Sequence, residues 1–267
     1  MYRNFPSPQQ EAQILCAIRR AGEIMTSALE VQDAVSAKPG TRNYVTAYDV
    51  KVQKYLFSTL AEIAPEAAFL GEEEDVHVLP EDKPCFVIDP IDGTLNFIRD
   101  LHCSCVSVGI VWGGKAVWGA VYNPYTKELF RARKDGGAYL NDQPIHVSEL
   151  PLEDALLSVG SSPYIRETNW EKTFAIASSL FLRCSDFRRS GSAAYDLCTL
   201  ACGRTDLFFE LILGPWDYCA GAIIIEEAGG SIHQPDGAPL RYDTGCPVFA
   251  SNAASHDAAL RLLREKL

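Results

Sequence analysis

The stretch DPIDGTLNF, residues 89–97, follows the apolar run CFVI and places two aspartates, Asp89 and Asp92, three positions apart. Pro and Ile lie between them, and a short turn of this kind could direct both carboxylates at one point. Gly93 then permits close approach of the backbone, and the free N–H groups at the start of the following helix are suited to phosphate oxygens. Aspartate before proline and aspartate as a helix cap are also common turn chemistry, so the stretch needs support from the rest of the chain.

Further acidic residues provide that support. Glu72 and Glu73 follow the apolar run AFLG, and Asp217 lies in GPWDYCAGA. Folds of the α/β type present ligand-binding groups at strand ends, and carboxylates gathered there raise one another's pKa unless cations are bound. Magnesium prefers oxygen ligands, and two ions roughly 3.5–4 Å apart can hold the attacking and leaving oxygens of a displacement at phosphorus. The three acidic groups together therefore predict a magnesium site.

Composition narrows the class of protein. The 267 residues carry a formal net charge of −11, and the sequence pI is near 4.9. Such an acidic chain is a poor nucleic-acid binder, no apolar run reaches membrane-spanning length, and no signal peptide is expected. The nine cysteines are scattered without a C-x-x-C pair, which predicts reduced thiols and a cytoplasmic protein. The five histidines show no metal or triad spacing and are interpreted as surface or packing residues.

The apolar pattern predicts two halves. Residues 9–30 and 45–65 have helical periodicity, and residues 103–140 predict an antiparallel meander. After residue 151, strands and helices alternate. We expect short strands in 67–73, 85–90, 155–161, 181–187, 205–211 and 247–252, and helices in 168–181, 192–203, 216–229 and 255–267. The chain would be one domain, 1–267, whose two lobes, about 1–150 and 151–267, share one active site.

The motifs resemble the signature set of the inositol monophosphatase family, the magnesium-dependent, lithium-sensitive phosphatases. The resemblance rests on GEE at 71–73, DPIDGT at 89–94, WDYCAGA at 216–222, VTAYDVKVQKYL at 45–56, RRSGSAAYDLC at 188–198 and GRTDLFFEL at 203–211. It covers essentially the whole chain in order. It implies a layered αβαβα fold of the α/β class, a homodimer, two to three Mg²⁺ ions, Li⁺ as an inhibitor, and a small phosphorylated polyol as substrate.

The resemblance also implies roles for individual residues. Glu72, Asp89 and the carbonyl of Ile91 would hold one magnesium, Asp89, Asp92 and Asp217 a second, and Glu72 a third, weaker one. Thr94 and Glu72 would orient the attacking water, Asp49 would hydrogen-bond Thr94, and the amides of Gly93 and Thr94 would receive the phosphate. On the substrate side the matching positions are Asp92, Gly191, Ser192, Ala193, Glu210 and Asp217. No role follows for Tyr195 or Gly214.

These features predict metal-assisted hydrolysis of a phosphate monoester, with myo-inositol 1-phosphate ranked first. Alternatives are histidinol phosphate, fructose 1,6-bisphosphate and adenosine 3′,5′-bisphosphate, or, in a different class, a regulatory protein with a vestigial site. The ranking rests on Glu210, because a carboxylate suits a neutral polyol or an ammonium group and repels a second phosphate.

Overall fold

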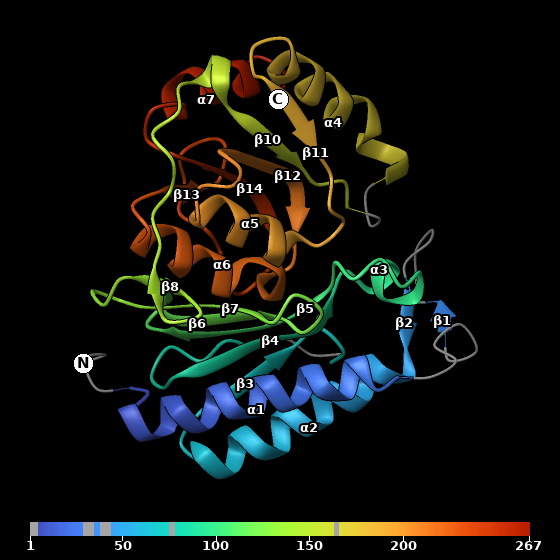
Figure 1. Cartoon of the computed structure of the whole chain (residues 1–267), viewed down its shortest axis with the longest axis vertical. Helices are drawn as coiled ribbons and strands as arrows, with labels where there is room; N and C mark the ends of the chain where they lie inside the picture. The colour runs from blue at the N-terminus through green and yellow to red at the C-terminus, as the bar shows by residue number, and fades with distance from the viewer. Residues whose placement is uncertain (1–4, 29–34, 38–43, 75–77, 163–165) are drawn as a thin grey trace.

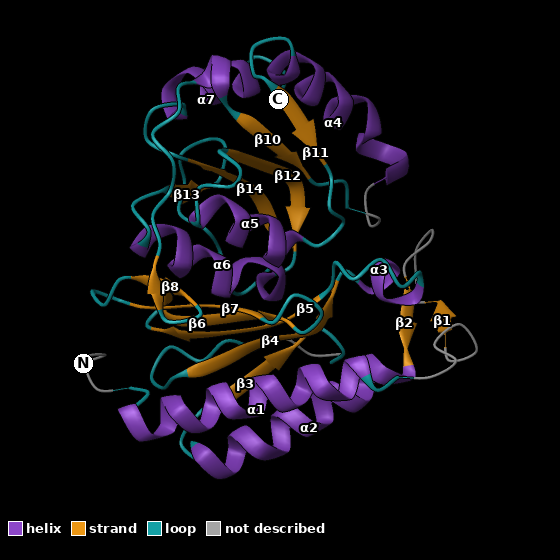
Figure 2. Cartoon of the chain, viewed as in Figure 1, coloured by secondary structure: helices purple, strands orange, loops and turns teal. Residues whose placement is uncertain are grey.

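Five layers of helices and strands are stacked in the order helix, sheet, helix, sheet, helix (Figures 1 and 2). The computed structural model describes residues 5–28, 35–37, 44–74, 78–162 and 166–267. One outer layer consists of α1 (Pro8–Thr26) and α2 (Ala47–Ile63), and the other of α4 (Arg166–Phe181) and α7 (His256–Arg264). The predicted αβαβα fold is confirmed.

The lower sheet in Figure 1 has seven strands in the order β3-β4-β5-β6-β7-β8-β9. These are β3 (Ala68–Gly71), β4 (Cys85–Asp92), β5 (Cys105–Trp112), β6 (Lys115–Asn123), β7 (Glu128–Arg133), β8 (Ala138–Leu140) and β9 (Gln143–Pro144). Strands β3 and β4 are parallel, and every later pair is antiparallel. The predicted meander is therefore confirmed.

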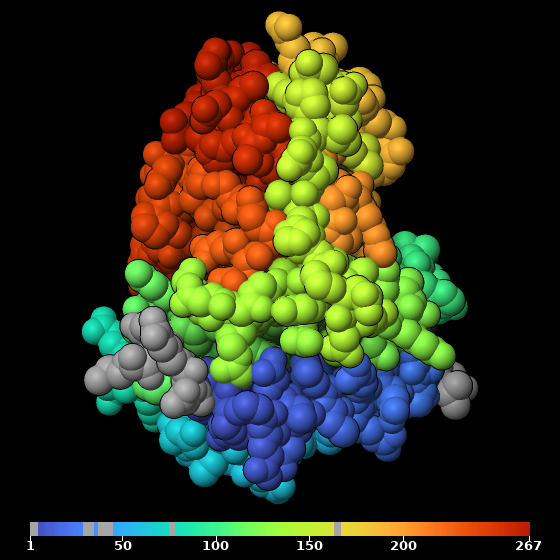
Figure 3. Space-filling model, turned by 60° about the vertical axis from the view of Figure 1, so that its left-hand side comes forward, coloured from blue at the N-terminus to red at the C-terminus, as the bar shows by residue number. Residues whose placement is uncertain are grey.

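The upper sheet has five strands in the order β11-β10-β12-β14-β13. These are β10 (Leu156–Val159), β11 (Asp186–Arg188), β12 (Leu207–Leu213), β13 (Ser231–His233) and β14 (Cys246–Ser251). The pairs formed by β10 are parallel, and those formed by β14 are antiparallel. In Figure 3 the yellow-green chain after β8 passes over the surface from the lower half to the upper half.

Helices α5 (Ala193–Ala201) and α6 (Pro215–Glu227) fill the middle layer, and α6 is apolar on all sides because a sheet covers each face. Gly109 of β5 and Gly119 of β6 are paired directly beneath it. A Cβ atom on Gly109 would lie 2.3 Å from the sulfur of Cys219, and one on Gly119 would lie 2.7 Å from Cα of Ala220. The two glycines therefore let α6 approach the sheet closely, which brings the start of α6 to the end of β4.

The remaining apolar surface is buried between the outer helices and the sheets. Ile18 of α1 and Leu56 of α2 pack with Phe86 and Trp118 of the lower sheet, and all four side chains are fully buried. Across the upper sheet, residues of α4 and α7 form a separate cluster with β10 and β12. Among the described residues, no helix is both long enough and apolar enough to cross a membrane.

Several boundaries differ from the sequence expectation. Helix α1 ends at Thr26, and residues 29 and 30, also expected to be helical, lie outside the described residues. The strand expected in 181–187 is confined to β11, because α4 continues through Phe181. Strands β1 (Val35–Ala37), β2 (Tyr44–Thr46) and β13 were not predicted, because three residues are too few to show a period.

Candidate active site

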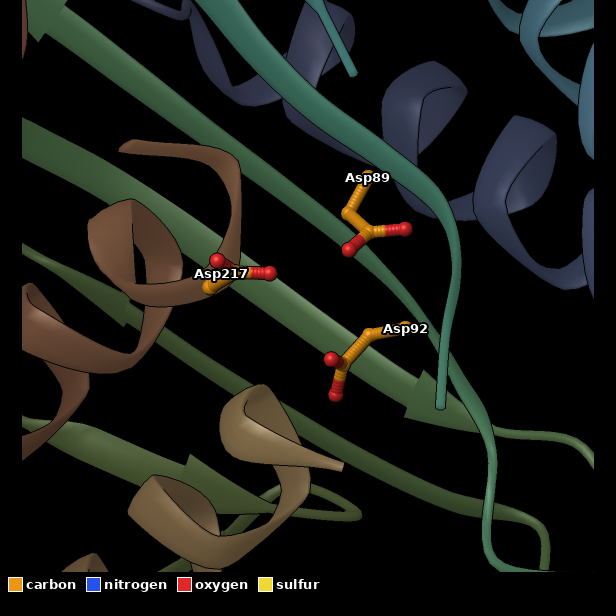
Figure 4. A group of neighbouring side chains, drawn as sticks. All are labelled: Asp89, Asp92 and Asp217. Carbon is orange, nitrogen blue, oxygen red and sulfur yellow. The ribbon is translucent and has the colours of Figure 1, made fainter. Parts of the chain in front are cut away.

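Three carboxylates from two elements converge between the sheets. Asp89 and Asp92 belong to β4 and Asp217 to the first turn of α6, and each offers an oxygen within 4.8 Å of the others. Figure 4 shows the three side chains directed at a common space. Asp89 and Asp92 are buried and Asp217 is half-buried. Because all three donors are anionic oxygens, the cluster suits a hard divalent cation such as Mg²⁺.

The aspartates of β4 reach this space through an irregularity within the strand. The sequence suggested a turn, but β4 continues to Asp92, with a register shift against β5 between Asp89 and Asp92. Pro90 has no N–H for the ladder, which suits it to such a bulge. The amide of Ile91 donates a 3.0 Å hydrogen bond to Asp89 Oδ1, which fixes that carboxylate within the bulge.

Asp217 is held by the geometry of its helix start. It is the third residue of α6, and its Oδ2 accepts a 2.7 Å hydrogen bond from the amide of Gly214, the N-cap residue. A Cβ atom at Gly214 would lie 2.4 Å from the ring of Trp216. The sequence assigned no role to Gly214, and the structure shows that its lack of a side chain leaves room for this ring at the start of α6.

Without a cation these carboxylates are costly to ionise. Burial raises the pKa of Asp89 and of Asp217 well above the usual range, and the neighbouring carboxylates raise both further. Burial raises the pKa of Asp92 to about 6, although hydrogen bonds from Ser192, Ala194 and Cys105 act in the opposite direction. A bound divalent ion reverses this balance, because its charge favours the ionised ligands.

Glu72 lies beside the cluster rather than within it. It follows β3, and its amide donates a 3.1 Å hydrogen bond to the carbonyl of Ile88 on the parallel strand β4. Among the charged neighbours of Asp89, Glu72 contributes most to raising the pKa of that aspartate. The half-buried Glu72 side chain therefore lies next to the end of β4, where the resemblance placed a shared ligand.

The pair expected on the water side is in contact. Thr94 begins α3 (Thr94–Ile98), and its hydroxyl is 3.3 Å from Asp49 Oδ1 and 3.2 Å from the carbonyl oxygen of Ile91. Asp49 is fully buried and its Oδ2 accepts hydrogen bonds of 2.7 and 2.6 Å from the amide and hydroxyl of Thr46. A capping box at the start of α2 thus orients the carboxylate that contacts Thr94.

Two glycines with positive φ lie on either side of this region. Gly93, with φ 83°, precedes α3, and Gly191, with φ 87°, precedes α5. The hydroxyl of Ser192 and the amide of Ala194, the latter at 3.0 Å, both donate to Oδ2 of Asp92. The start of α5 therefore holds a carboxylate of the acidic cluster in place, and Ala193 lies between these two donors.

Glu210 lies on β12 with 6% of its surface exposed, and its carboxyl group accepts no hydrogen bond from any residue that the structure describes. Burial raises its pKa to about 8, with Arg189 acting in the opposite direction. Gly160 makes room for it, because a Cβ atom there would lie 1.8 Å from Glu210 Oε2. The charge of Glu210 also raises the pKa of Asp217, so the two carboxyl groups are near each other.

Asn96 is a site residue that the sequence analysis missed. Its side chain is 5% exposed and its Nδ2 donates to the carbonyl of Cys103 at 2.7 Å and to that of Ser190 at 2.9 Å. Through these two hydrogen bonds, Asn96 links the loop before α5 to the segment that follows Asp89 and Asp92 of β4. Its position two residues after Thr94 was the only signal in the sequence. Tyr195, also left without a role, donates a 2.8 Å hydrogen bond to Glu128 of β7 and so links α5 to the lower sheet.

Comparison with known proteins identifies the family. The model of the inositol monophosphatase family matches residues 7–267. The chain belongs to this family. It is 36% identical over 254 residues to inositol monophosphatase 3 of Solanum lycopersicum, with 93% of this chain and 94% of that protein covered. It is 35% identical over 251 residues to the Nus factor SuhB of Vibrio cholerae, with 93% of each covered.

A solved structure of a similar protein has the same fold as this chain. The extragenic suppressor protein suhB of Bartonella henselae superposes with a TM-score of 0.87 at 31% identity, covering 96% of this chain and 99% of that one. Membership of the metal-dependent inositol monophosphatase family agrees with the acidic cluster at the end of β4. The individual roles assigned above to its residues stay predictions.

Proposed function

We propose that this member of the inositol monophosphatase family hydrolyses the phosphate monoester of a small polyol with the help of Mg²⁺, and we rank myo-inositol 1-phosphate first. The observation that carries the proposal is the convergence of Asp89, Asp92 and Asp217 with their oxygens within 4.8 Å. Three carboxylates this close would not be kept together in a buried site without a cation that offsets their charge. Family membership makes the phosphate group of the substrate the natural partner of that cation, with the polyol leaving as the alcohol.

We infer that Asp89, Glu72 and the carbonyl of Ile91 would hold one Mg²⁺, that Asp89, Asp92 and Asp217 would hold another, and that Glu72 would serve a third. Bound Mg²⁺ would neutralise phosphate charge and lower the pKa of a water molecule. The positions of Asp89, Asp92 and Asp217 support this assignment, since each directs an oxygen at the same space.

The chain's own groups would position the water. The single hydroxyl proton of Thr94 has two acceptors, Asp49 Oδ1 and the Ile91 carbonyl. With its proton engaged, Thr94 Oγ1 still has a lone pair that can accept a hydrogen bond from water. We propose that Thr94, with the carboxylate of Glu72, orients the attacking water, and that Asp49 keeps the hydroxyl proton directed away from it.

The phosphate and the alcohol would lie on opposite sides of Asp92. Thr94 is the first residue of α3, so its amide has no partner within the helix and, with that of Gly93, can meet a phosphate oxygen. Gly191, Ser192, Ala193 and Glu210 would meet the hydroxyl groups. Because these groups come from both halves of the chain, we propose one domain whose two lobes share the active site.

The charge argument for ranking substrates is weaker in the structure than in the sequence. With a pKa near 8, Glu210 is protonated at neutral pH in the free protein and would not repel a second phosphate. Fructose 1,6-bisphosphate and adenosine 3′,5′-bisphosphate therefore remain competitors, together with histidinol phosphate. The first place of myo-inositol 1-phosphate now rests on the relatives named inositol monophosphatase.

Measurement of phosphate release tests the proposed reaction. Purified protein should release phosphate from myo-inositol 1-phosphate with added Mg²⁺ and stop when EDTA is present. Comparison of kcat/KM across the four candidate substrates then identifies the preferred one. If the protein releases phosphate from none of these substrates at any Mg²⁺ concentration, the proposal is rejected.

A regulatory role is a second candidate, because a relative covered over 93% of its length is named a Nus factor. Such a role would be performed through protein partners and would survive Asp92→Asn, whereas the phosphatase role would not. We further propose a homodimer in the cytoplasm, as the resemblance and the reduced cysteines suggest. Light scattering of the purified protein tests the homodimer.

A further inference from the structure

Two histidines meet on the upper sheet, outside the acidic cluster. His233 ends β13, and His256 is the first residue of α7 (Figure 1). Their Nε2 atoms are 3.4 Å apart although the residues are separated by 23 positions in the chain. The ring of Phe249 lies 5.8 Å from that of His233 and 5.7 Å from that of His256, measured between centroids. Sequence spacing gave no hint of this pair.

Hydrogen bonds hold the far nitrogen of each ring. His233 Nδ1 is 2.6 Å from the carbonyl oxygen of Gln234, and a carbonyl can only accept, so this nitrogen carries the proton. The Nε2 atom of neutral His233 therefore has a free lone pair. His256 Nδ1 is 2.8 Å from Ser251 Oγ, which can accept a hydrogen bond as well as donate one. Metal-binding histidines have this same support, with the second nitrogen donating to a nearby acceptor.

The separation of the Nε2 atoms fits a metal better than a hydrogen bond. At 3.4 Å it exceeds the usual N–H hydrogen-bond range. Two nitrogens bound to one tetrahedral ion at about 2.0–2.1 Å lie about 3.3–3.4 Å apart. Two imidazole rings aligned end to end with 3.4 Å between their Nε2 atoms would have centroids farther apart than the 5.1 Å found here. The two rings are therefore inclined, so that both Nε2 atoms can face one ion. We propose that His233 and His256 bind a divalent transition-metal ion of the zinc, cobalt and nickel class through their Nε2 atoms.

The surroundings can complete such a site. A cavity of about 260 Å³ lined by His256 and Asp257 leaves room for water beside His256. Among the described residues no third histidine, cysteine or carboxylate lies at ligand distance from the two Nε2 atoms, so water would supply the remaining ligands. Burial and the neighbouring His233 lower the pKa of His256, Arg264 lowers it further, and Asp257 acts in the opposite direction. The net effect favours neutral His256, the form that binds metal. Imidazole donors select against Mg²⁺, which separates this site from the acidic cluster.

Cobalt(II) is a suitable probe, because a four-coordinate site with nitrogen ligands absorbs visible light far more strongly than an octahedral oxygen site. Full-length protein would be titrated with Co²⁺ in excess Mg²⁺, and the spectrum and the number of ions bound would be recorded. We expect one strongly absorbing Co²⁺ per chain, and its loss in His233→Gln and in His256→Gln. The exposed His146 supplies the matched control, since His146→Gln should bind as wild type does.

Two further measurements do not depend on replacing a ligand. Ser251→Ala removes only the partner of His256 Nδ1 and should weaken Co²⁺ binding roughly 10–100-fold. In the wild-type protein, Co²⁺ binding should weaken as the pH is lowered, because protons compete with the metal for the imidazole nitrogens. Absence of the strongly absorbing Co²⁺ from wild type, or its full retention in both His→Gln variants, would overturn the proposal. Neither result depends on whether the protein is a phosphatase.

Discussion

Glu210→Gln should make the metal-free protein more stable. The carboxyl group of Glu210 is 6% exposed and receives no hydrogen bond from the described residues, and its pKa is raised from 4.5 to about 8. The folded protein therefore retains a proton that the unfolded chain loses above pH 4.5. Its free energy of unfolding therefore falls as the pH rises from about 4.5 to about 8. The Glu210→Gln variant does not show this fall, because glutamine does not titrate.

The size of the effect follows from the two pKa values. The pKa of Glu210 is about 8 in the folded protein and 4.5 in the unfolded chain, so its ionisation costs about 5 kcal/mol more in the folded protein. By pH 7 the ionisation of Glu210 has lowered the free energy of unfolding of the wild-type protein by about 3 kcal/mol, and at pH 5 by less than about 1 kcal/mol. Glu210→Gln should therefore raise the free energy of unfolding by up to these amounts at the two pH values.

Urea unfolding in EDTA at pH 5 and pH 7 measures both differences. Asp206→Asn is the matched control, because Asp206 is also buried beside β12 but accepts hydrogen bonds from Ser148 and, at 2.6 Å, from the amide of Leu156. That variant should lose about 1–3 kcal/mol of stability. If Glu210→Gln is no more stable than wild type at pH 7, the carboxyl group is ionised and paired in solution, and the reasoning fails.

The same variant tests the role of Glu210 in catalysis. Substrate hydroxyls that donate to Glu210 would favour its ionised form, and such a charge-assisted hydrogen bond is worth roughly 1.5–3 kcal/mol. Glu210→Gln should then reduce kcat/KM for myo-inositol 1-phosphate about ten- to a hundredfold and leave p-nitrophenyl phosphate nearly unaffected. Equal losses on both substrates would assign Glu210 to support of the metal site.

Four further outcomes are expected. Asp92→Asn should nearly abolish phosphate release and the rise in melting temperature that Mg²⁺ gives wild type, both measurable in one preparation. Lithium should inhibit uncompetitively and more weakly in Asp217→Asn; purely competitive inhibition contradicts this. Asn96→Asp removes two hydrogen bonds from Nδ2 and should raise KM for the polyol ester more than for p-nitrophenyl phosphate, whereas equal changes would indicate a general loss of structure. Gly214→Ala should lower the melting temperature, because its Cβ would collide with Trp216; an unchanged value would show that the ring moves at little cost.

The sequence alone determined the helices, the meander, the later alternation of strands and helices, and the acidic residues, while the layered αβαβα arrangement followed from the resemblance to the family. Apolar periods of helices and strands are local, so they are visible within each segment of sequence. The spacing of Asp89 and Asp92 and the position of Asp217 pointed to a metal site, and the structure brings the three together. Short strands such as β13 escaped because three residues do not establish a period.

Only the tertiary structure decided the state and partners of the polar groups. Packing decides which donors fold against a buried carboxyl group. Asp206 accepts hydrogen bonds from Ser148 and the amide of Leu156, whereas Glu210, four residues later, accepts none from the described residues. His233 and His256 meet because β13 pairs with β14, which places His233 opposite Phe249, and the first residue of α7 packs back against Phe249 and Ser251 of β14. Contacts between residues far apart in the chain follow from packing of the layers, which no local pattern of residues records.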